Sequence, residues 1–238
     1  MRRVLSTGLL GLAFMAVALT PAHAVPILQL FIEGATYDVA TETWITTASA
    51  FTLWVIGDVD PPGPQFAAIL NVHLTAAFPT AESGTITLTP TTTGLLTDPS
   101  TPSAPSQTIF GGNDGVRPTM NDGSLLPAHG VYVAGTSFDQ WDIGDLSLAD
   151  SPVGDFINAF PSTFPDRGQI NAYSVSVTGY SLVHFDAFNH VASSTHSKFA
   201  PFSHDAEAAV PEPTSLIILG LGLAGGAALR ARRHRPKV

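Results

Sequence analysis

Between residues 25 and 209, short runs of β-branched and aromatic residues alternate with turn sequences. Residues 85–89 alternate threonine with isoleucine or leucine, which is the period-two pattern of a half-buried strand. The turn-forming residues cluster at 57–64, 98–106, 111–115 and 121–123. Comparable apolar runs stand at Ile27–Ile32, Trp44–Thr47, Phe51–Ile56, Phe66–Leu74, Val131–Val133, Tyr173–Val177 and Tyr180–Phe185. This pattern predicts an all-β fold, an antiparallel β-sandwich.

One segment of this body has a helical signal. Within Asp145–Phe160, Ser151 followed by Pro152 fits a helix cap and first helical residue. We therefore expect one short helix there.

The N-terminus has the composition of a secretory signal peptide. Arg2 and Arg3 precede the apolar stretch Val4–Leu19, and the small residues Ala22 and Ala24 follow it. This order predicts a signal peptide at residues 1–24 that delivers the chain to the secretory translocon, with cleavage after Ala24.

The C-terminus has an apolar run bounded by a basic tip. Residues 214–229 contain no charge and would reach roughly 24 Å as a helix, somewhat short of a ~30 Å hydrocarbon core. Basic residues that stay cytoplasmic would fix its orientation. We expect a single transmembrane helix at 214–229, followed by a stop-transfer cluster of Arg230, Arg232, Arg233 and Arg235.

The tail as a whole, residues 210–238, resembles the PEP-CTERM sorting signal of Gram-negative bacteria. The order of features is Val210, Pro211, Glu212, Pro213, an apolar helix and an Arg-rich end. The resemblance implies recognition by an exosortase, a membrane-embedded protease, near Pro211–Pro213. It also implies transient membrane anchoring, then a final location at the cell surface or outside, often in exopolysaccharide-producing, biofilm-forming bacteria.

The start of the body, residues 28–57, is similar to a group of PEP-CTERM proteins called choice-of-anchor N. The segment Leu126–Tyr132, residues 171–185 and residues 199–205 fit the same group. No enzymatic activity is attached to that group, so the resemblance assigns no catalytic residue.

Charge is distributed unevenly along the chain. Of its 19 acidic residues, all lie between Glu33 and Glu212, where only Arg117, Arg167 and Lys198 are basic, so this span has a formal charge of −16. Such a surface repels nucleic acid and suits either divalent cations or colloidal solubility. The absence of cysteine excludes disulfides and thiolate-bound metals.

Three groups of residues are candidates for metal or ligand chemistry. Asp58 and Asp60 begin like a calcium loop, but position twelve is Ile69 where a carboxylate is needed, so an ordinary turn is favoured. In an extended strand, Asp139, Trp141 and Asp145 would share one face and Asp142 would point away. That group is compatible with a mixture of surface and core, with calcium or sugar contact, or with hydrolysis.

Histidines gather near the end of the body, at His184, His190, His196 and His204, together with Asp186 and Asp205. Their spacing matches no standard metal motif, although folding could assemble them around zinc or copper.

From these features we expect residues 25–209 to form one exported, non-enzymatic domain at the cell surface or in the extracellular matrix. The alternatives are a calcium- or carbohydrate-binding module and a secreted hydrolase. No Gly-x-Ser-x-Gly nucleophile turn supports the hydrolase.

Overall fold

The computed structural model describes most of the body and a small part of the tail. The described residues are 25–60, 68–91, 108–110, 117–120, 123–128, 134–147, 151–156, 159–189, 205–210, 221–224 and 230. The predicted signal peptide, with Ala22 and Ala24, lies outside them, as do Pro211, Glu212 and Pro213.

The strands form two sheets, as the sequence pattern predicts. In the first sheet, β4 is central and pairs with β1 on one side and β10 on the other, and β10 then pairs with β6 and β9. Its strands are β1 (Val25–Ile32), β4 (Ala50–Asp60), β6 (Thr85–Thr91), β9 (Ser151–Val153) and β10 (Asp166–Thr178).

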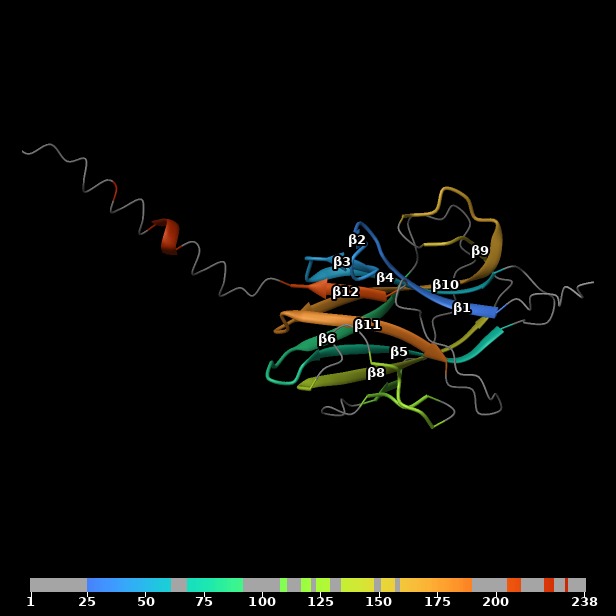
Figure 1. Ribbon diagram of the computed structural model, residues 1–238, viewed down its shortest axis with the longest axis horizontal. Helices are drawn as coiled ribbons and strands as arrows, with labels where there is room; N and C mark the ends of the chain where they lie inside the picture. The colour runs from blue at the N-terminus through green and yellow to red at the C-terminus, as the bar shows by residue number, and fades with distance from the viewer. Residues whose placement is uncertain are drawn as a thin grey trace, which may run out of the picture.

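The second sheet has the order β2-β3-β12-β11-β5-β8-β7. Its strands are β2 (Thr36–Asp38), β3 (Thr43–Thr46), β5 (Ala68–Pro79), β7 (Thr108–Phe110), β8 (Thr136–Ser147), β11 (Leu182–Asn189) and β12 (Asp205–Ala209). The last strand, β12, lies between β11 and β3 (Figure 1). It runs antiparallel to β11 and parallel to β3.

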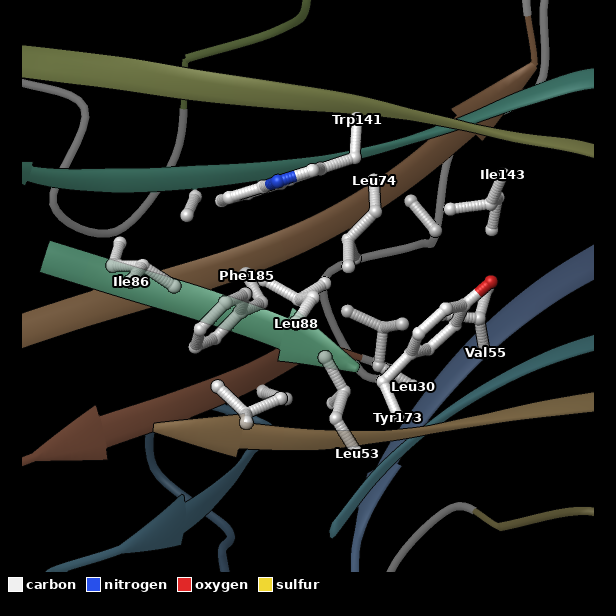
Figure 2. Packing of buried hydrophobic residues seen from close by; sticks show 14 of the residues in the cluster. Leu30, Leu53, Val55, Leu74, Ile86, Leu88, Trp141, Ile143, Tyr173 and Phe185 are labelled. Atoms are coloured by element: carbon white, nitrogen blue, oxygen red, sulfur yellow. The ribbon is translucent and has the colours of Figure 1, made fainter. Parts of the chain in front are cut away.

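The main core fills the space between the two sheets. Alternate residues of β1, β4, β5, β6, β8, β10, β11 and β12 point into it, because successive side chains of a strand face opposite sides. Leu30 and Leu53 of the first sheet face Leu74 and Trp141 of the second, and each of these side chains is at most 1% exposed (Figure 2). Ala206 and Ala208 place the inner face of β12 in the same core.

A second, smaller core covers the outer face of the first sheet. Phe156 packs against Trp54 and Phe31, with ring centroids 5.6 and 5.2 Å apart. Trp44 of the second sheet closes the cluster by donating a hydrogen bond from Nε1 to the Phe156 carbonyl at 2.9 Å.

The prediction of a short helix within Asp145–Phe160 is wrong for the described residues of this segment, which are strand or irregular. Residues Asp145–Ser147 end β8, and β9 pairs with the first residues of β10. The backbone N–H of Phe156 donates to Gln29 Oε1 at 2.9 Å, so a partner on β1 takes the bond that a helix would make internally. Burial of Phe156 against the sheet outweighs the local capping signal.

No described helix is long and apolar enough to cross a membrane. Of the predicted span at 214–229, only residues 221–224 are described, and they are helical. Arg230 is described as helical too, whereas Arg232, Arg233 and Arg235 lie outside the described residues.

Substitution of Leu74 tests the main core, because its side chain is fully buried between the sheets. We expect Leu74→Ala to lower the free energy of unfolding by about 2–5 kcal/mol, measured by urea denaturation. The control Val39→Ala, at a side chain that is 77% exposed, should change it by less than about 0.5 kcal/mol. Equal effects of the two substitutions would contradict the predicted packing.

Candidate functional site

The strands β11 and β12 bring four titratable side chains onto one face of the second sheet. Their antiparallel register pairs His184 with Glu207 and Phe185 with Ala206, and Asp186 and Asp205 are the next residues beyond the last pair. The intervening Phe185 and Ala206 point into the main core, so these four side chains point to the opposite face. We call His184, Asp186, Asp205 and Glu207 the histidine–carboxylate cluster.

The cluster is buried although it faces away from the main core. His184 is 3% exposed, Asp186 and Asp205 are each 1% exposed, and Glu207 is 19% exposed. The same side of the sheet carries a small apolar cluster in which Phe188 of β11 packs with Met120 and Leu126. Ionisable groups are rarely buried to this degree unless they are paired or bind a metal ion.

Both ring nitrogens of His184 face carboxylates. The Nε2 atom lies 3.7 Å from Asp186 Oδ2 and 3.7 Å from Asp205 Oδ2. The Nδ1 atom lies 3.5 Å from Glu207 Oε2. The two aspartates thus approach one nitrogen and the glutamate approaches the other.

Electrostatics favours a charged imidazole in this structure. Burial alone would lower the pKa of His184, but the carboxylates of Asp186, Asp205 and Glu207 outweigh burial and raise this pKa well above its usual value. A positive charge at the centre of the cluster therefore offsets part of the negative charge around it.

One imidazole nitrogen and one oxygen from each aspartate form a group of possible metal ligands. The three donor atoms, from His184, Asp186 and Asp205, all lie within 4.8 Å of one another. The sequence places these residues in its histidine group, and the structure brings these three together. His190, His196 and His204 lie outside the described residues.

Glu207 is the member that the sequence analysis missed. The alternation of Val183, His184, Phe185 and Asp186 shows which residues share a face of β11. No comparable pattern in the sequence marks Asp205–Ala209 as a strand, so the position of Glu207 opposite His184 emerges only from the pairing.

Asp58 and Asp60 do not begin a loop. Both belong to β4, where they pair with Ile27 and Val25 of β1. The Asp58 side chain is 2% exposed and accepts a long hydrogen bond from Gln29 Nε2 at 3.5 Å. The turn expected from residue 57 onward is wrong as far as Asp60, because the strand continues through it.

The group around Trp141 is divided by a β-bulge. Trp141 is 1% exposed in the main core, so its ring is not open to stacking on a sugar. Gly144 has a φ of 81°, and the register of β5 and β8 shifts between Ile69 and His73. The bulge moves Asp145 to the side opposite Trp141, so the predicted shared face is wrong for Asp145.

Two of the three aspartates in this group stabilise the bulge. Asp142 Oδ1 accepts a hydrogen bond from the Gly144 N–H at 2.9 Å, and Asp145 Oδ1 accepts one from the Asn71 N–H at 2.8 Å. Asn71 itself has a φ of 49°. These bonds satisfy backbone groups that the ladder leaves unpaired, which is a structural role.

A comparison with protein-family models assigns the C-terminus. The model for the PEP-CTERM protein-sorting motif matches residues 209–233. The chain carries a PEP-CTERM sorting motif. It is therefore an exported protein that an exosortase sorts, and its C-terminus anchors it in the membrane before processing. The match covers about a tenth of the chain and starts at Ala209, the last residue of β12.

No curated protein matches the chain. The similarity of the body to the choice-of-anchor N group stays a prediction, as do the signal peptide and the processing sites.

The environment of Asp139 gives a pH-dependent prediction. Burial raises the pKa of its carboxyl group above the ordinary value. Because the folded-state pKa exceeds the unfolded one, the protonated carboxyl stabilises the fold at low pH, and this contribution is lost as the pH rises through the folded-state pKa. The variant Asp139→Asn avoids that loss, so its Tm relative to the wild type should be higher at pH 7 than at pH 3.

Glu42→Gln, at an exposed carboxylate, is the control, and its Tm difference from the wild type should be similar at both pH values. Differential scanning fluorimetry of the three proteins measures this. A relative Tm of Asp139→Asn that does not rise between pH 3 and pH 7 would contradict the prediction.

Proposed function

We propose that this protein is a non-enzymatic component of the cell surface or extracellular matrix that is associated with exopolysaccharide. The observation that carries the proposal is the PEP-CTERM motif at residues 209–233, which marks the chain for sorting by an exosortase. The acidic body, at −16 between Glu33 and Glu212, is compatible with a hydrated polysaccharide layer. It argues against nucleic acid as a partner.

Sorting would start with export and continue with arrest of the tail in the membrane. The signal peptide, residues 1–24, directs the chain to the secretory translocon, and the body folds on the far side of the membrane. The helix at 214–229 then halts in the membrane, with the arginine cluster on the cytoplasmic side. Proline disfavours helical backbone at its own position and at the residue before it, so Pro211 and Pro213 would keep Glu212 from being recruited into the helix.

The described body ends very close to the recognition segment in the sequence. β12 ends at Ala209, and its backbone is paired on both sides up to Ala208. Only Val210 separates this strand from Pro211. A protease acting near Pro211–Pro213 would therefore act within a few residues of the end of β12.

The roles of the candidate carboxylates support a non-enzymatic body. Asp142 and Asp145 bond to backbone N–H groups of the bulge, and Asp58 lies buried against Gln29. Glycoside hydrolysis by the usual mechanism needs two carboxyl groups at a defined separation. None of these three residues has an environment that favours such a role.

A carbohydrate-binding role has one specific observation in its favour. An open depression of about 530 Å³ lies at the β2–β3 edge. Its lining combines the Tyr37 ring, the Asp38 carboxylate and threonine hydroxyls, which together suit a sugar with one apolar face. The lining residues are Gly34, Thr36, Tyr37, Asp38, Val39, Ile45, Thr46 and Thr47.

This second function is tested by filling the depression. Thr47 is exposed at its rim, so Thr47→Trp should block it without disturbing the core. We expect the wild type to be retained on immobilised exopolysaccharide from the host and Thr47→Trp to elute earlier. Thr91→Trp, at an exposed position on β6, serves as the control and should elute with the wild type. Co-elution of Thr47→Trp with the wild type would exclude the depression as the binding site.

The sorting proposal is tested by replacing Pro211, Glu212 and Pro213 with alanine in the host. We expect the variant to accumulate uncleaved in the membrane fraction, whereas the wild type is processed and released. Processing is followed by immunoblotting of cell fractions with an antibody against the body. Replacing Pro102 and Pro105 with alanine is the control and should leave processing unchanged. Normal release of the triple variant would refute sorting through this motif.

A further inference from the structure

The histidine–carboxylate cluster has the arrangement of a metal site. We propose that His184, Asp186 and Asp205 bind one divalent transition-metal ion of the zinc or manganese type, with Glu207 orienting the imidazole. The bound ion would link β11 to β12 and so fix the last strand before the sorting motif. This inference concerns the stability of the body and does not depend on the exopolysaccharide role.

The distances favour a shared ion over direct hydrogen bonds. An imidazole Nε2 has at most one hydrogen to donate, yet Asp186 and Asp205 both lie 3.7 Å from it. A charge-assisted N–H···O bond measures about 2.7–2.9 Å, so neither contact has that length. Ligands bound about 2.1 Å from a tetrahedral zinc ion lie about 3.4 Å apart, which is close to the two nitrogen–oxygen separations, and all three donor atoms lie within 4.8 Å of one another. The two carboxylates and the nitrogen thus face a common point.

The other side of the imidazole supports the same assignment. A histidine that binds a metal through one nitrogen usually donates its second N–H to a carboxylate, which fixes the ring and its tautomer. His184 Nδ1 faces Glu207 Oε2 at 3.5 Å, from the position directly across the strand pair. Glu207 is therefore a positioning residue and not a ligand.

The donor types indicate the class of metal. Calcium and magnesium favour sites built from oxygen atoms, whereas an imidazole nitrogen with carboxylate oxygens suits zinc, manganese and related ions. With a neutral imidazole, the two aspartates balance the charge of a divalent ion. Metal binding would therefore displace the proton that the carboxylates otherwise hold on His184.

The strand pairing makes the site rigid before any ion arrives. His184 and Asp186 are two positions apart on β11, and Asp205 is the first residue of β12, next to Ala206, which pairs with Phe185. Thr43 of β3 pairs with Asp205, and Thr75 of β5 pairs with Asp186, which fixes the flanking strands on either side. Ligands that hydrogen-bonded strands hold in place lose little freedom when they bind an ion.

The bound ion would chiefly stabilise β12. This strand has only five residues, it is the last strand of the body, and the sorting motif begins at its final residue. An ion held jointly by β11 and β12 adds a link that does not depend on backbone hydrogen bonds. It would keep Asp205–Ala209 in the sheet while the adjoining segment is bound or pulled by a membrane protease.

The experiment uses the full chain in detergent, dialysed against EDTA and then titrated separately with ZnCl₂, MnCl₂ and CaCl₂. Isothermal titration calorimetry should give one tight site per chain for zinc or manganese and none of comparable affinity for calcium. At a metal concentration 100-fold above its Kd, the Tm should rise by about 5–10 °C. A wild type that binds neither transition metal would overturn the proposal.

Variants locate the ion. His184→Gln and Asp205→Asn should each remove the tight site and the metal-dependent rise in Tm. Glu207→Gln should keep the stoichiometry but weaken binding by about 10–100-fold. The control His73→Gln changes another buried histidine of the same sheet, whose ring packs on Phe188, and should bind metal like the wild type. Unchanged tight binding in His184→Gln and Asp205→Asn would assign the ion to other residues and overturn the proposal.

Hydrogen exchange on the wild type tests the site even if those variants fail to fold. Exchange of the backbone amides in Asp205–Ala209 should slow at least tenfold when zinc is added, while the exposed turn at 39–42 should not change. Equal exchange of Asp205–Ala209 with and without the metal would overturn the proposed link between β11 and β12.

Discussion

The pairing of β11 with β12 is the interaction on which much of this structure depends. One face of the pair, through Phe185, Ala206 and Ala208, completes the main core. The other face buries His184 among three carboxylates. Because β12 also joins β3 to the rest of the second sheet, its loss would separate β2 and β3 from β11 and open the core at that edge. The second sheet and the main core therefore depend on a strand of only five residues.

This arrangement relates the body to the tail. The sorting motif begins at the residue where β12 ends, so any force or binding event on Pro211–Pro213 acts first on this strand. Buried charges are costly, and they persist where something compensates for them. A metal ion at the cluster would supply that compensation and would connect the fold of the exported body to the conditions it meets after export.

Much of the fold is visible in the sequence, because its signals are local. The alternation at 85–89 and the runs at Ile27–Ile32 and Tyr173–Val177 became β6, β1 and β10. Pairing overrode local preference elsewhere. Ser151 and Pro152 suggest a helix but form β9 with β10, and the alanine-rich Asp205–Ala209 has weak strand propensity yet pairs with both β3 and β11.

The candidate site was less predictable than the fold, because it depends on strand pairing between residues that are far apart in the sequence. Asp186 and Asp205 are 19 positions apart, and only the register of β11 and β12 brings them close together. Around Trp141, alternation correctly leaves Asp142 pointing away, but a bulge at Gly144 reverses Asp145, and no local pattern announces that shift. The positions of charged residues in the sequence identify an acidic body, but only the structure shows which of these residues are buried.

Anomalous diffraction would show directly whether one metal ion lies between β11 and β12. Crystals of the zinc-loaded protein would be measured above and below the zinc absorption edge. We expect a single anomalous peak about 2 Å from His184 Nε2 and from one carboxylate oxygen each of Asp186 and Asp205. Ordered side chains at all three positions with no peak between them would contradict this expectation.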